Sequence, residues 1–355
     1  MIFQQFRHEE GGCLSYIVGC SQKEVCAVVD PQFDIEPYLK YARDRSLKIT
    51  EIFETHAQAD HLSGAKALSE ATGAKVRYHE SAVPGFPVAK VADGEKIMVG
   101  NVLFTVLHTP GHTADSISLL VSDTPRSKEP WLVLTGDTLF VGDTGRPDLD
   151  GSAEQLYDSI WGKLLKLDDS VEIYPTHFAG SSCGKAMSPK PSSTIGFERR
   201  FNPSLQVKSK REFVEFVTAD LPVQPPRFQK VREFNLGRLK DPPIERTYDR
   251  SSLQITAEEL KAKLDRGETP LLLDVREPFE YKLSNIGGKL IPLRDLPKKY
   301  SELDPGMEII VHCHTGRRSQ DAVEFLYEKG FTNVKNLLGG IDAWSARIDP
   351  AVPRY

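Results

Sequence analysis

Four apolar segments in the first half of the chain each lead into a side chain that can bind a metal ion. The segments and their side chains are KITEIFETH with His56, VLFTVLHTPGH with His112, WLVLTGD with Asp137 and VEIYPTH with His177. Short apolar runs rich in β-branched residues predict strands, and ligands of α/β sheets gather at the carboxyl ends of strands. Taken singly, each residue could be a turn residue or a hydrogen-bonded core residue. Together they predict one metal site at one end of a sheet.

The order of the predicted elements indicates an α/β fold in more than one domain. A chain of 355 residues exceeds what one compact core usually holds. Strand and helix patterns alternate through the first half, as in DIEPYLKYARDRSL between two apolar runs, whereas residues 203–251 are polar and proline-rich, and a fresh pattern starts near Leu253. We therefore expect a domain with a trailing segment over 1–240, a linker over 241–252 and a second domain over 253–355.

The composition argues against nucleic acid and membranes as partners of this chain. A net charge of −5 offers no positive footprint for nucleic acid or an anionic membrane. No run approaches the roughly 20 apolar residues of a membrane span, and the first residues lack the apolar core of a signal peptide, so we expect a cytoplasmic protein. Five scattered cysteines without a CxxC pair argue against a disulfide framework and a structural zinc site. Small molecules are the expected partners.

The sequence THAQADH followed by TPGHT, TGDT and YPTHF resembles the metallo-β-lactamase superfamily, whose signature is HxHxDH, then a later His, an Asp and a final His. The resemblance covers roughly residues 10 to 180, and it implies an αββα sandwich. One position departs from the signature. The second histidine of HxHxDH is here Gln58, whose amide binds a borderline metal less well than imidazole does.

This departure favours one branch of the superfamily. Its two-metal hydrolases use the histidine that Gln58 replaces, whereas the resemblance to persulfide dioxygenases implies one Fe(II) per chain, held by His56, His112 and Asp137. Two histidines and one carboxylate on one face of the metal are typical of non-haem Fe(II) oxygenases. The implied reaction oxidises a thiol persulfide, expected to be glutathione persulfide, with O₂ to sulfite and the thiol.

The resemblance also implies roles for residues around the metal. Asp60, His61 and His177 are expected to orient the ligands or metal-bound water rather than to form a second metal site. The stretch after His177 resembles the bacterial persulfide dioxygenases more than the hydrolases. The candidates for substrate binding in this half are Arg146, Cys183 and Lys185. For Arg146, a solvated position in a polar loop is an equally good interpretation.

A second pattern, EIIVHC followed by HTGRRS, places Cys313 between a predicted strand and a predicted helix. Backbone amides and a helix N-terminus stabilise a thiolate, and Arg317 and Arg318 add positive charge. Only four residues separate Cys313 from Arg318, one fewer than in the phosphate loop of tyrosine phosphatases. The shorter loop suits a sulfur atom held as a persulfide.

Residues 253–345 resemble a single rhodanese domain through DVRE, NIGGKLIP, CxxGxRS and LLGGIDAW. The resemblance implies sulfur transfer from thiosulfate to a thiol such as glutathione, or the reverse, through a persulfide on Cys313. Arg276 and Arg318 are the candidates for binding the donor's oxyanion, within a loop that also holds His314, Thr315 and Gly316. His314 stands where arginine is common in the family, which leaves the donor open.

Two other functions stay open at this stage, a dinuclear zinc thioester hydrolase joined to a rhodanese and a non-catalytic carrier or sensor of sulfane sulfur. The thiol carrier, the direction of sulfur flow and the oligomeric state also stay open, and a homodimer is compatible with the sequence. The remaining cysteines and histidines are interpreted as core residues: Cys13, Cys20, Cys26, His8, His79, His108 and His312.

Overall fold

The computed structural model divides the chain into two compact units, Met1–Pro243 and Ile244–Tyr355. The structure describes residues 1–8, 12–148, 150–179, 181, 183–219, 221, 228–242 and 253–355. Most of the predicted linker therefore lies outside the described residues. No helix in the described part of the chain is both long enough and apolar enough to span a membrane.

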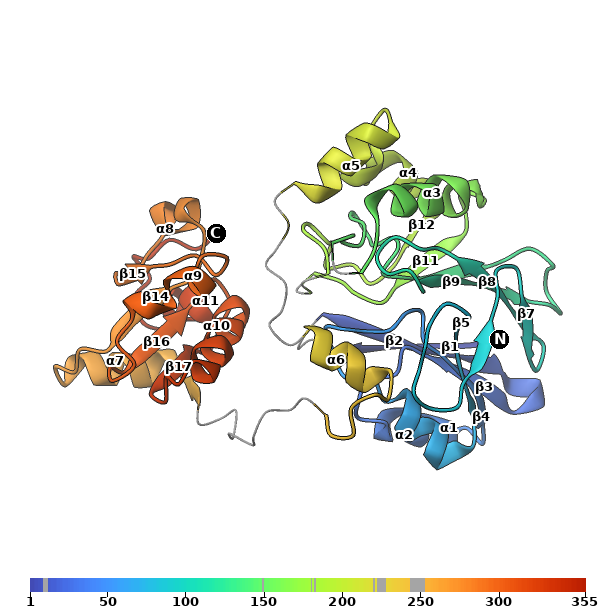
Figure 1. Ribbon diagram of the computed structural model, residues 1–355, viewed down its shortest axis with the longest axis horizontal. Helices are drawn as coiled ribbons and strands as arrows, with labels where there is room; N and C mark the ends of the chain where they lie inside the picture. The colour runs from blue at the N-terminus through green and yellow to red at the C-terminus, as the bar shows by residue number, and fades with distance from the viewer. Residues whose placement is uncertain are drawn as a thin grey trace. The chain divides into compact units, whose positions relative to one another are not determined.

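Two six-stranded sheets face each other in the N-terminal unit (Figure 1). The first sheet has the order β1(Ile2–His8), β2(Cys13–Cys20), β3(Val25–Val29), β4(Lys48–Phe53), β5(Lys75–His79), β6(Ala89–Val91). The second has the order β12(Ser193–Thr194), β11(Glu172–Pro175), β10(Leu132–Gly136), β9(Ile117–Asp123), β8(Val102–His108), β7(Lys96–Val99). The inner faces carry alternating buried apolar residues, and the rings of Phe53 and Phe104 stack between the sheets with centroids 5.0 Å apart.

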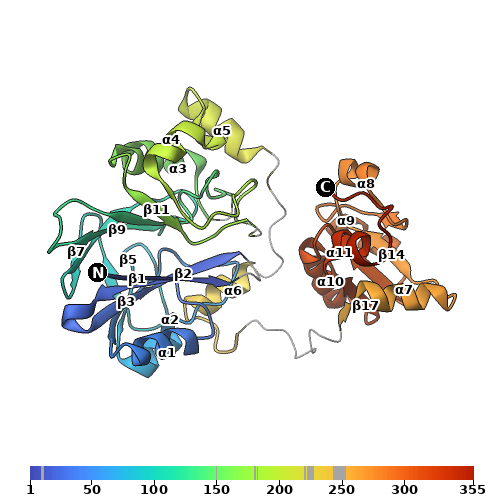
Figure 2. The same cartoon turned by 180° about the vertical axis from the view of Figure 1, so that it is seen from behind.

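Helices cover the outer face of each sheet, which gives the predicted αββα order of layers (Figures 1 and 2). On the first sheet lie α1(Glu36–Asp44), α2(Ala65–Thr72) and α6(Phe228–Asn235), and on the second lie α3(Ala153–Gly162), α4(Ile195–Phe201) and α5(Lys210–Thr218). Helix α1 buries Tyr38 and Ala42, and α3 buries Leu156 and Ile160, each against its sheet. The predicted trailing segment thus contributes two helices, α5 and α6, to the N-terminal unit.

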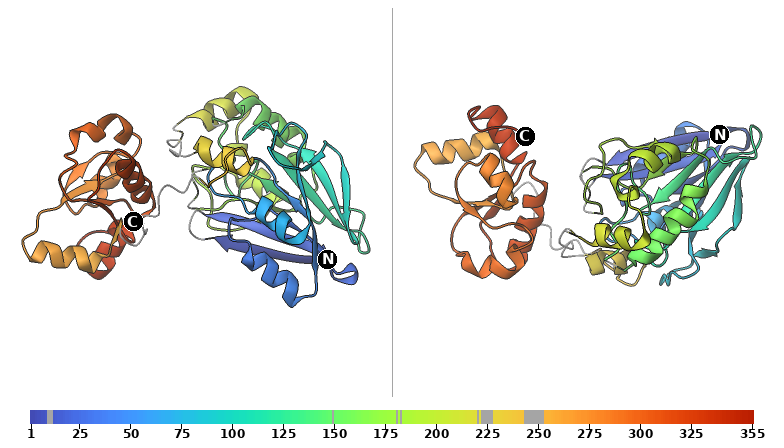
Figure 3. Two further views of the ribbon diagram at one scale, coloured as in Figure 1. Left: turned by 60° about the horizontal axis from the view of Figure 1, so that its bottom comes forward. Right: turned by 90° about the horizontal axis from the view of Figure 1, so that it is seen from above.

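The C-terminal unit has one parallel sheet with helices on both faces (Figure 3). The strand order is β13(Gln254–Ile255), β17(Val334–Leu337), β16(Ile309–His312), β14(Leu271–Asp274), β15(Lys289–Leu290). The helices are α7(Ala257–Asp265), α8(Pro278–Leu283), α9(Leu296–Lys299), α10(Arg317–Glu328) and α11(Gly340–Arg347). Alternate residues of β16 point to opposite faces, so that Val311 packs in the core with α10 and Ile310 in the core with α7 and α11. The α/β fold class predicted from the sequence is confirmed.

Candidate active sites

The predicted iron ligands converge at one end of the N-terminal sandwich. His56 follows β4, His112 follows β8 and Asp137 follows β10, and their potential ligand atoms all lie within 4.8 Å of one another. Asp137 Oδ2 is 3.4 Å from His112 Nε2 and 3.9 Å from His56 Nε2. Among the described residues, Asp137 Oδ2 has no hydrogen-bond partner although it is buried. A buried, unpaired carboxylate oxygen facing two imidazoles fits a bound cation.

Hydrogen bonds at the far nitrogen of each histidine favour the tautomer that binds a metal. His112 Nδ1 lies 2.8 Å from the carbonyl oxygen of Arg146 and donates to it, because a carbonyl can only accept. Thr55 Oγ1 donates its proton to Asp30 Oδ1, 3.1 Å away, and can therefore accept from His56 Nδ1, also 3.1 Å away. Both Nε2 lone pairs are then free for a metal. Burial and the nearby His112 lower the pKa of His56 to about 4, which keeps this ring neutral at physiological pH.

Gln58, which stands where the family signature has a histidine, is fully buried and bonded to another residue. Its Nε2 donates to Asp30 Oδ1 over 3.1 Å. The same oxygen accepts the backbone N–H of Thr55 over 2.8 Å. Burial raises the pKa of Asp30 to about 6, although the hydrogen bonds from Thr55 oppose the shift. Gln58 therefore belongs to the group of residues that orients the Thr55–His56 segment.

A second cluster adjoins the first and contains one residue that the sequence did not single out. The side chains of Cys13, Asp60, His61 and His177 offer potential ligand atoms within 4.8 Å of one another. His177 Nδ1 donates to Asp137 Oδ1 over 2.7 Å, and its Nε2 is 2.8 Å from Asp60 Oδ2. His177 thus connects the two clusters and contacts Asp137 directly. Cys13 is buried, as its interpretation as a core residue requires, and it also forms a β-bridge with His177 at the start of β2, a pairing that leaves no local pattern in the sequence.

Asn235, in α6, was also missed. Its side chain is 5% exposed, accepts a hydrogen bond from the backbone N–H of Ser63 over 2.8 Å and donates to the carbonyl oxygens of Gln58 and His61 over 3.0 and 2.8 Å. One side chain therefore satisfies three backbone groups of the loop between β4 and α2, which carries His56 and His61. In the sequence, Asn235 stands on the apolar face of a possible helix in the predicted trailing segment, and nothing else distinguishes it.

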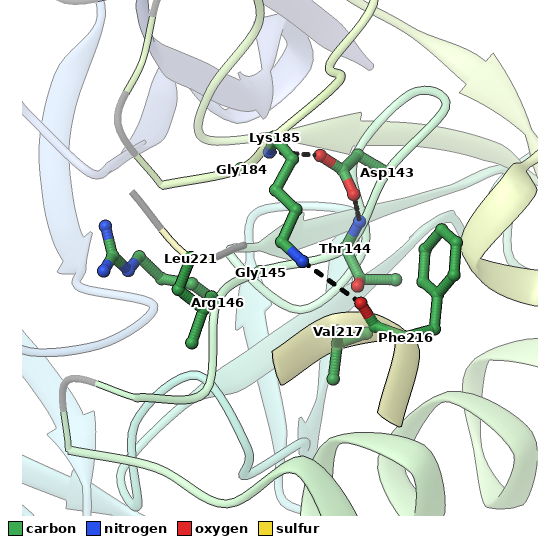
Figure 4. A pocket seen from close by; sticks show the side chains of 9 residues that line it. All are labelled: Asp143, Thr144, Gly145, Arg146, Gly184, Lys185, Phe216, Val217 and Leu221. Atoms are coloured by element: carbon green, nitrogen blue, oxygen red, sulfur yellow. Dashed lines mark hydrogen bonds between the residues drawn. The ribbon is translucent and has the colours of Figure 1, made fainter. Parts of the chain in front are cut away.

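Two of the three predicted substrate-binding residues of this unit, Arg146 and Lys185, line a small pocket (Figure 4). The third, Cys183, accepts the backbone N–H of Arg146 at its carbonyl oxygen over 3.1 Å. Arg146 is buried and pairs with Asp148 through two hydrogen bonds of 2.8 and 2.7 Å. Cys183 is buried beside Asp137 and His177, and burial raises the pKa of its thiol well above the ordinary value. Lys185 lines the pocket and donates to the carbonyl oxygens of Phe216 and Ala219.

The two loops that form this pocket are joined by Asp143, which the sequence analysis did not identify. Asp143 Oδ2 accepts the backbone N–H groups of Lys185 and Ala186 over 2.6 and 2.7 Å. The cavity measures about 10 Å³, room for about one water molecule. Arg146 is thus buried and paired, whereas Lys185 is exposed but already donates to two carbonyl oxygens.

In the C-terminal unit, Cys313 follows β16 and precedes α10, as predicted. Its side chain is 1% exposed, and its sulfur accepts the backbone N–H of Gly316 over 3.2 Å and lies 3.3 Å from Ser319 Oγ. Gly316 has φ of 95°, a left-handed conformation that glycine tolerates without strain, and this turn aims its N–H at the sulfur. The loop therefore presents donors to the Cys313 sulfur before α10 begins.

The structure separates the roles of the two arginines expected to bind a donor oxyanion. Arg276 is fully buried and bonds to both carboxylate oxygens of Asp274 and to the carbonyl oxygen of Ser284. Arg318 forms a two-pronged ion pair with Glu280, with distances of 2.6 and 2.7 Å. Arg276 is thus used to hold Asp274 and Ser284 together. The charge of Arg318 is balanced by Glu280.

The other predicted residues of this loop differ in exposure. Arg317 and His314 are half-buried and Thr315 is exposed. The His314 ring stacks on the ring of Tyr355, with centroids 4.4 Å apart and an angle of 9° between the planes. Among the described residues Arg317 has no ion-pair partner, which makes it the cation of the loop that is open to a donor.

Known protein families match both the N-terminal unit and the C-terminal unit. The family model of the metallo-beta-lactamase superfamily matches residues 8–177, and that of the rhodanese-like domain matches residues 256–347. A hydroxyacylglutathione hydrolase of Pseudoalteromonas translucida is 34% identical over 190 residues, which cover 52% of this chain and 68% of the relative.

Two solved structures are similar over larger parts of the chain. A metallo-beta-lactamase from Staphylococcus aureus matches with a TM-score of 0.64 and 27% identity, over 95% of this chain and 98% of that one. ETHE1 from Myxococcus xanthus matches with a TM-score of 0.60 and 31% identity, over 67% of this chain and 99% of that one. The chain belongs to the metallo-β-lactamase superfamily and carries a rhodanese domain after its metallo-β-lactamase domain.

Proposed function

We propose that this protein oxidises a thiol persulfide at a single non-haem iron and transfers sulfane sulfur at Cys313. The observation that carries the first part is the triad of His56, His112 and Asp137, with an unpaired Asp137 Oδ2 between two imidazoles. Gln58 removes a third histidine from this face and bonds to Asp30 instead. Two histidines and one carboxylate suit Fe(II) and leave coordination positions open. Glutathione persulfide is the proposed substrate.

The protein's own residues prepare the site in three ways. The Asp30–Thr55 and Arg146 contacts fix which nitrogen of His56 and His112 faces the metal. Burial alone would raise the pKa of Asp137, but the hydrogen bond and charge of His177 lower it, so that the carboxylate is ionised. Fe(II) bound to this triad would supply the redox chemistry by which O₂ oxidises sulfur. Overall, one persulfide, one O₂ and one water yield sulfite, the thiol and two protons.

The rhodanese domain is proposed to exchange sulfane sulfur between a donor and a thiol. The Cys313 thiolate, stabilised by the Gly316 N–H, attacks the outer sulfur of the donor, and the bond between the two donor sulfurs breaks. The leaving group departs with the electron pair, and Cys313 carries a persulfide until a thiol such as glutathione accepts the sulfur. A persulfide made in this way is a substrate of the proposed dioxygenase.

The test is O₂ uptake by the anaerobically purified, iron-loaded protein on addition of glutathione persulfide, with sulfite measured in the same vessel. We expect equal amounts of O₂ consumed and sulfite formed. His112→Asn should abolish both, while the matched control His79→Asn, which changes a histidine outside the triad, should retain them. Wild-type protein that binds one iron but consumes no O₂ would contradict the proposed oxidation.

A thioester hydrolase with two zinc ions is the second candidate, and one observation favours it. The cluster of Cys13, Asp60, His61 and His177 could hold a second metal ion, and one similar protein is named a hydroxyacylglutathione hydrolase. Metal analysis separates the candidates. Two zinc ions per chain with hydrolysis of a glutathione thioester would support the hydrolase, whereas one iron with O₂ uptake supports the dioxygenase. Sulfur on Cys313 without either activity would indicate a carrier.

A further inference from the structure

The positive charges around Cys313 are largely balanced by acidic side chains of the same domain. The Arg318 guanidinium binds both carboxylate oxygens of Glu280, and the side chains of Glu280 and Arg318 are 8% and 36% exposed. Burial alone would raise the pKa of Glu280, but its bonds to Arg318 lower it to about 2, so the carboxylate is charged at neutral pH. A donor anion that is to bind Arg318 must therefore displace Glu280.

Tyr355 holds this carboxylate in place. Its hydroxyl donates to Glu280 Oε1 over 3.0 Å and accepts from Arg276 Nη1 over 2.7 Å. Since Arg276 is fully buried, Tyr355 is anchored at one end to a rigid group, while its ring lies flat on His314 in the catalytic loop. The Tyr355 ring and the Glu280 carboxylate therefore lie beside the catalytic loop, next to the Arg318 guanidinium that an incoming anion would bind.

Donors differ in the charge that they place on this site. With thiosulfate, attack by Cys313 on the outer sulfur breaks the bond between the sulfurs and expels sulfite, which leaves with the electron pair and two negative charges. With a thiol persulfide the leaving group is a thiolate, which carries one charge and takes up a proton from water. In both cases the sulfane sulfur ends on Cys313 without a change of total oxidation state. Transfer from thiosulfate therefore needs more positive charge near Cys313 to stabilise the leaving group than transfer from a thiol persulfide does.

We propose that Glu280, positioned by Tyr355, is a specificity-determining residue that disfavours thiosulfate at Cys313 and leaves thiol persulfides as the preferred sulfur donors. This inference rests on the sulfur transfer proposed above and names the donor class. Arg317 remains as the cation without an ion-pair partner among the described residues. Its single charge balances one carboxylate of a thiol carrier but not the dianion of thiosulfate.

The experiment measures how fast Cys313 gains one sulfur atom, by mass spectrometry of the full-length protein under anaerobic conditions, over a range of thiosulfate or glutathione persulfide concentrations. Three variants are compared with the wild type. Glu280→Gln removes the charge but keeps a hydrogen-bonding side chain, and Tyr355→Phe removes only the hydroxyl. Glu302→Gln is the control, because it removes the same charge from the ion pair with Lys289, whose atoms are 3.0 Å apart.

We expect Glu280→Gln to raise the second-order rate with thiosulfate by about fivefold, the factor that a partly exposed ion pair is worth. The rate with glutathione persulfide should stay within about twofold. Tyr355→Phe should shift the ratio of the two rates in the same direction by less, and Glu302→Gln should not shift it. A gain with one donor cannot result from damaged folding, so it separates selectivity from a structural role.

Two results would overturn the inference. An unchanged ratio in Glu280→Gln, or an equal loss with both donors, would give Glu280 only a structural role while sulfur transfer itself stands. If wild-type Cys313 gains sulfur from neither donor, the proposed transfer fails, and the inference fails with it.

Discussion

The contact between Asn235 and the ligand loop gives a quantitative test of how the metal site is held. Asn235→Ala removes three hydrogen bonds to the backbone of Gln58, His61 and Ser63. At about 1 kcal/mol for each buried hydrogen bond, the free energy of unfolding of the N-terminal unit should fall by about 3 kcal/mol. In a domain of this size 1 kcal/mol shifts the melting temperature by about 2–4 °C, so a decrease of about 6–12 °C is expected.

Iron binding should weaken as well, because the freed loop carries His56. The measurements are calorimetry of the full-length protein and the iron retained after dialysis against a weak chelator. Gln229→Ala is the matched control, since Gln229 lies on the exposed face of the same helix and the change should stay within about 0.5 kcal/mol. If Asn235→Ala melts within about 2 °C of the wild type and retains its iron, the loop is held by other contacts and the reasoning is wrong.

Three further changes test other parts of the structure. Asp137→Asn removes the anionic ligand, and we expect iron content to fall from one per chain to near zero by metal analysis while the fold, measured by circular dichroism, persists. Cys313→Ser should abolish sulfur transfer from thiosulfate but preserve O₂ uptake with preformed glutathione persulfide; loss of both would refute two independent sites. The third concerns pH. The pKa of Glu280, lowered by Arg318 from 4.5 to about 2, means that the folded chain binds fewer protons there than the unfolded chain. Its contribution, about 1–2 kcal/mol after solvent screening, is complete above pH 4.5 and disappears as the pH falls towards 2. The melting temperature of Glu280→Gln should therefore fall less than that of the wild type as the pH is lowered from 4.5 to 2. An equal fall in both proteins would contradict this prediction.

The sequence predicted best what depends on local pattern. His56, His112, Asp137 and His177 each follow an apolar strand, so their convergence could be inferred from the rule that strand ends share an edge. Cys313 was placed correctly between β16 and α10 for the same reason. The positions of these residues needed only the type and order of the elements.

Contacts between segments far apart in the chain could not be predicted in this way. Asn235 reaches the ligand loop from 172 residues further along the chain, and Cys13 meets His177 through a bridge at the edge of β2. Nothing in the local sequence distinguishes either residue from an ordinary core position. The partners of Arg146, Arg276 and Arg318 were likewise missed, because charge was counted without knowing which carboxylates lie opposite. Sequence thus identified the reactive groups better than the groups that position them.

Gln58 illustrates how a lost ligand can acquire a new role. Gln58 does not carry an imidazole for a metal, but its side chain is fully buried and donates a hydrogen bond to Asp30. Asp30 in turn accepts from Thr55, whose hydroxyl orients His56. The residue that in related hydrolases would bind metal therefore helps to fix the tautomer of a ligand that remains. Gln58 thus takes one possible ligand away from the face that carries His56 and His112, and through Asp30 and Thr55 it helps to hold His56, which remains there.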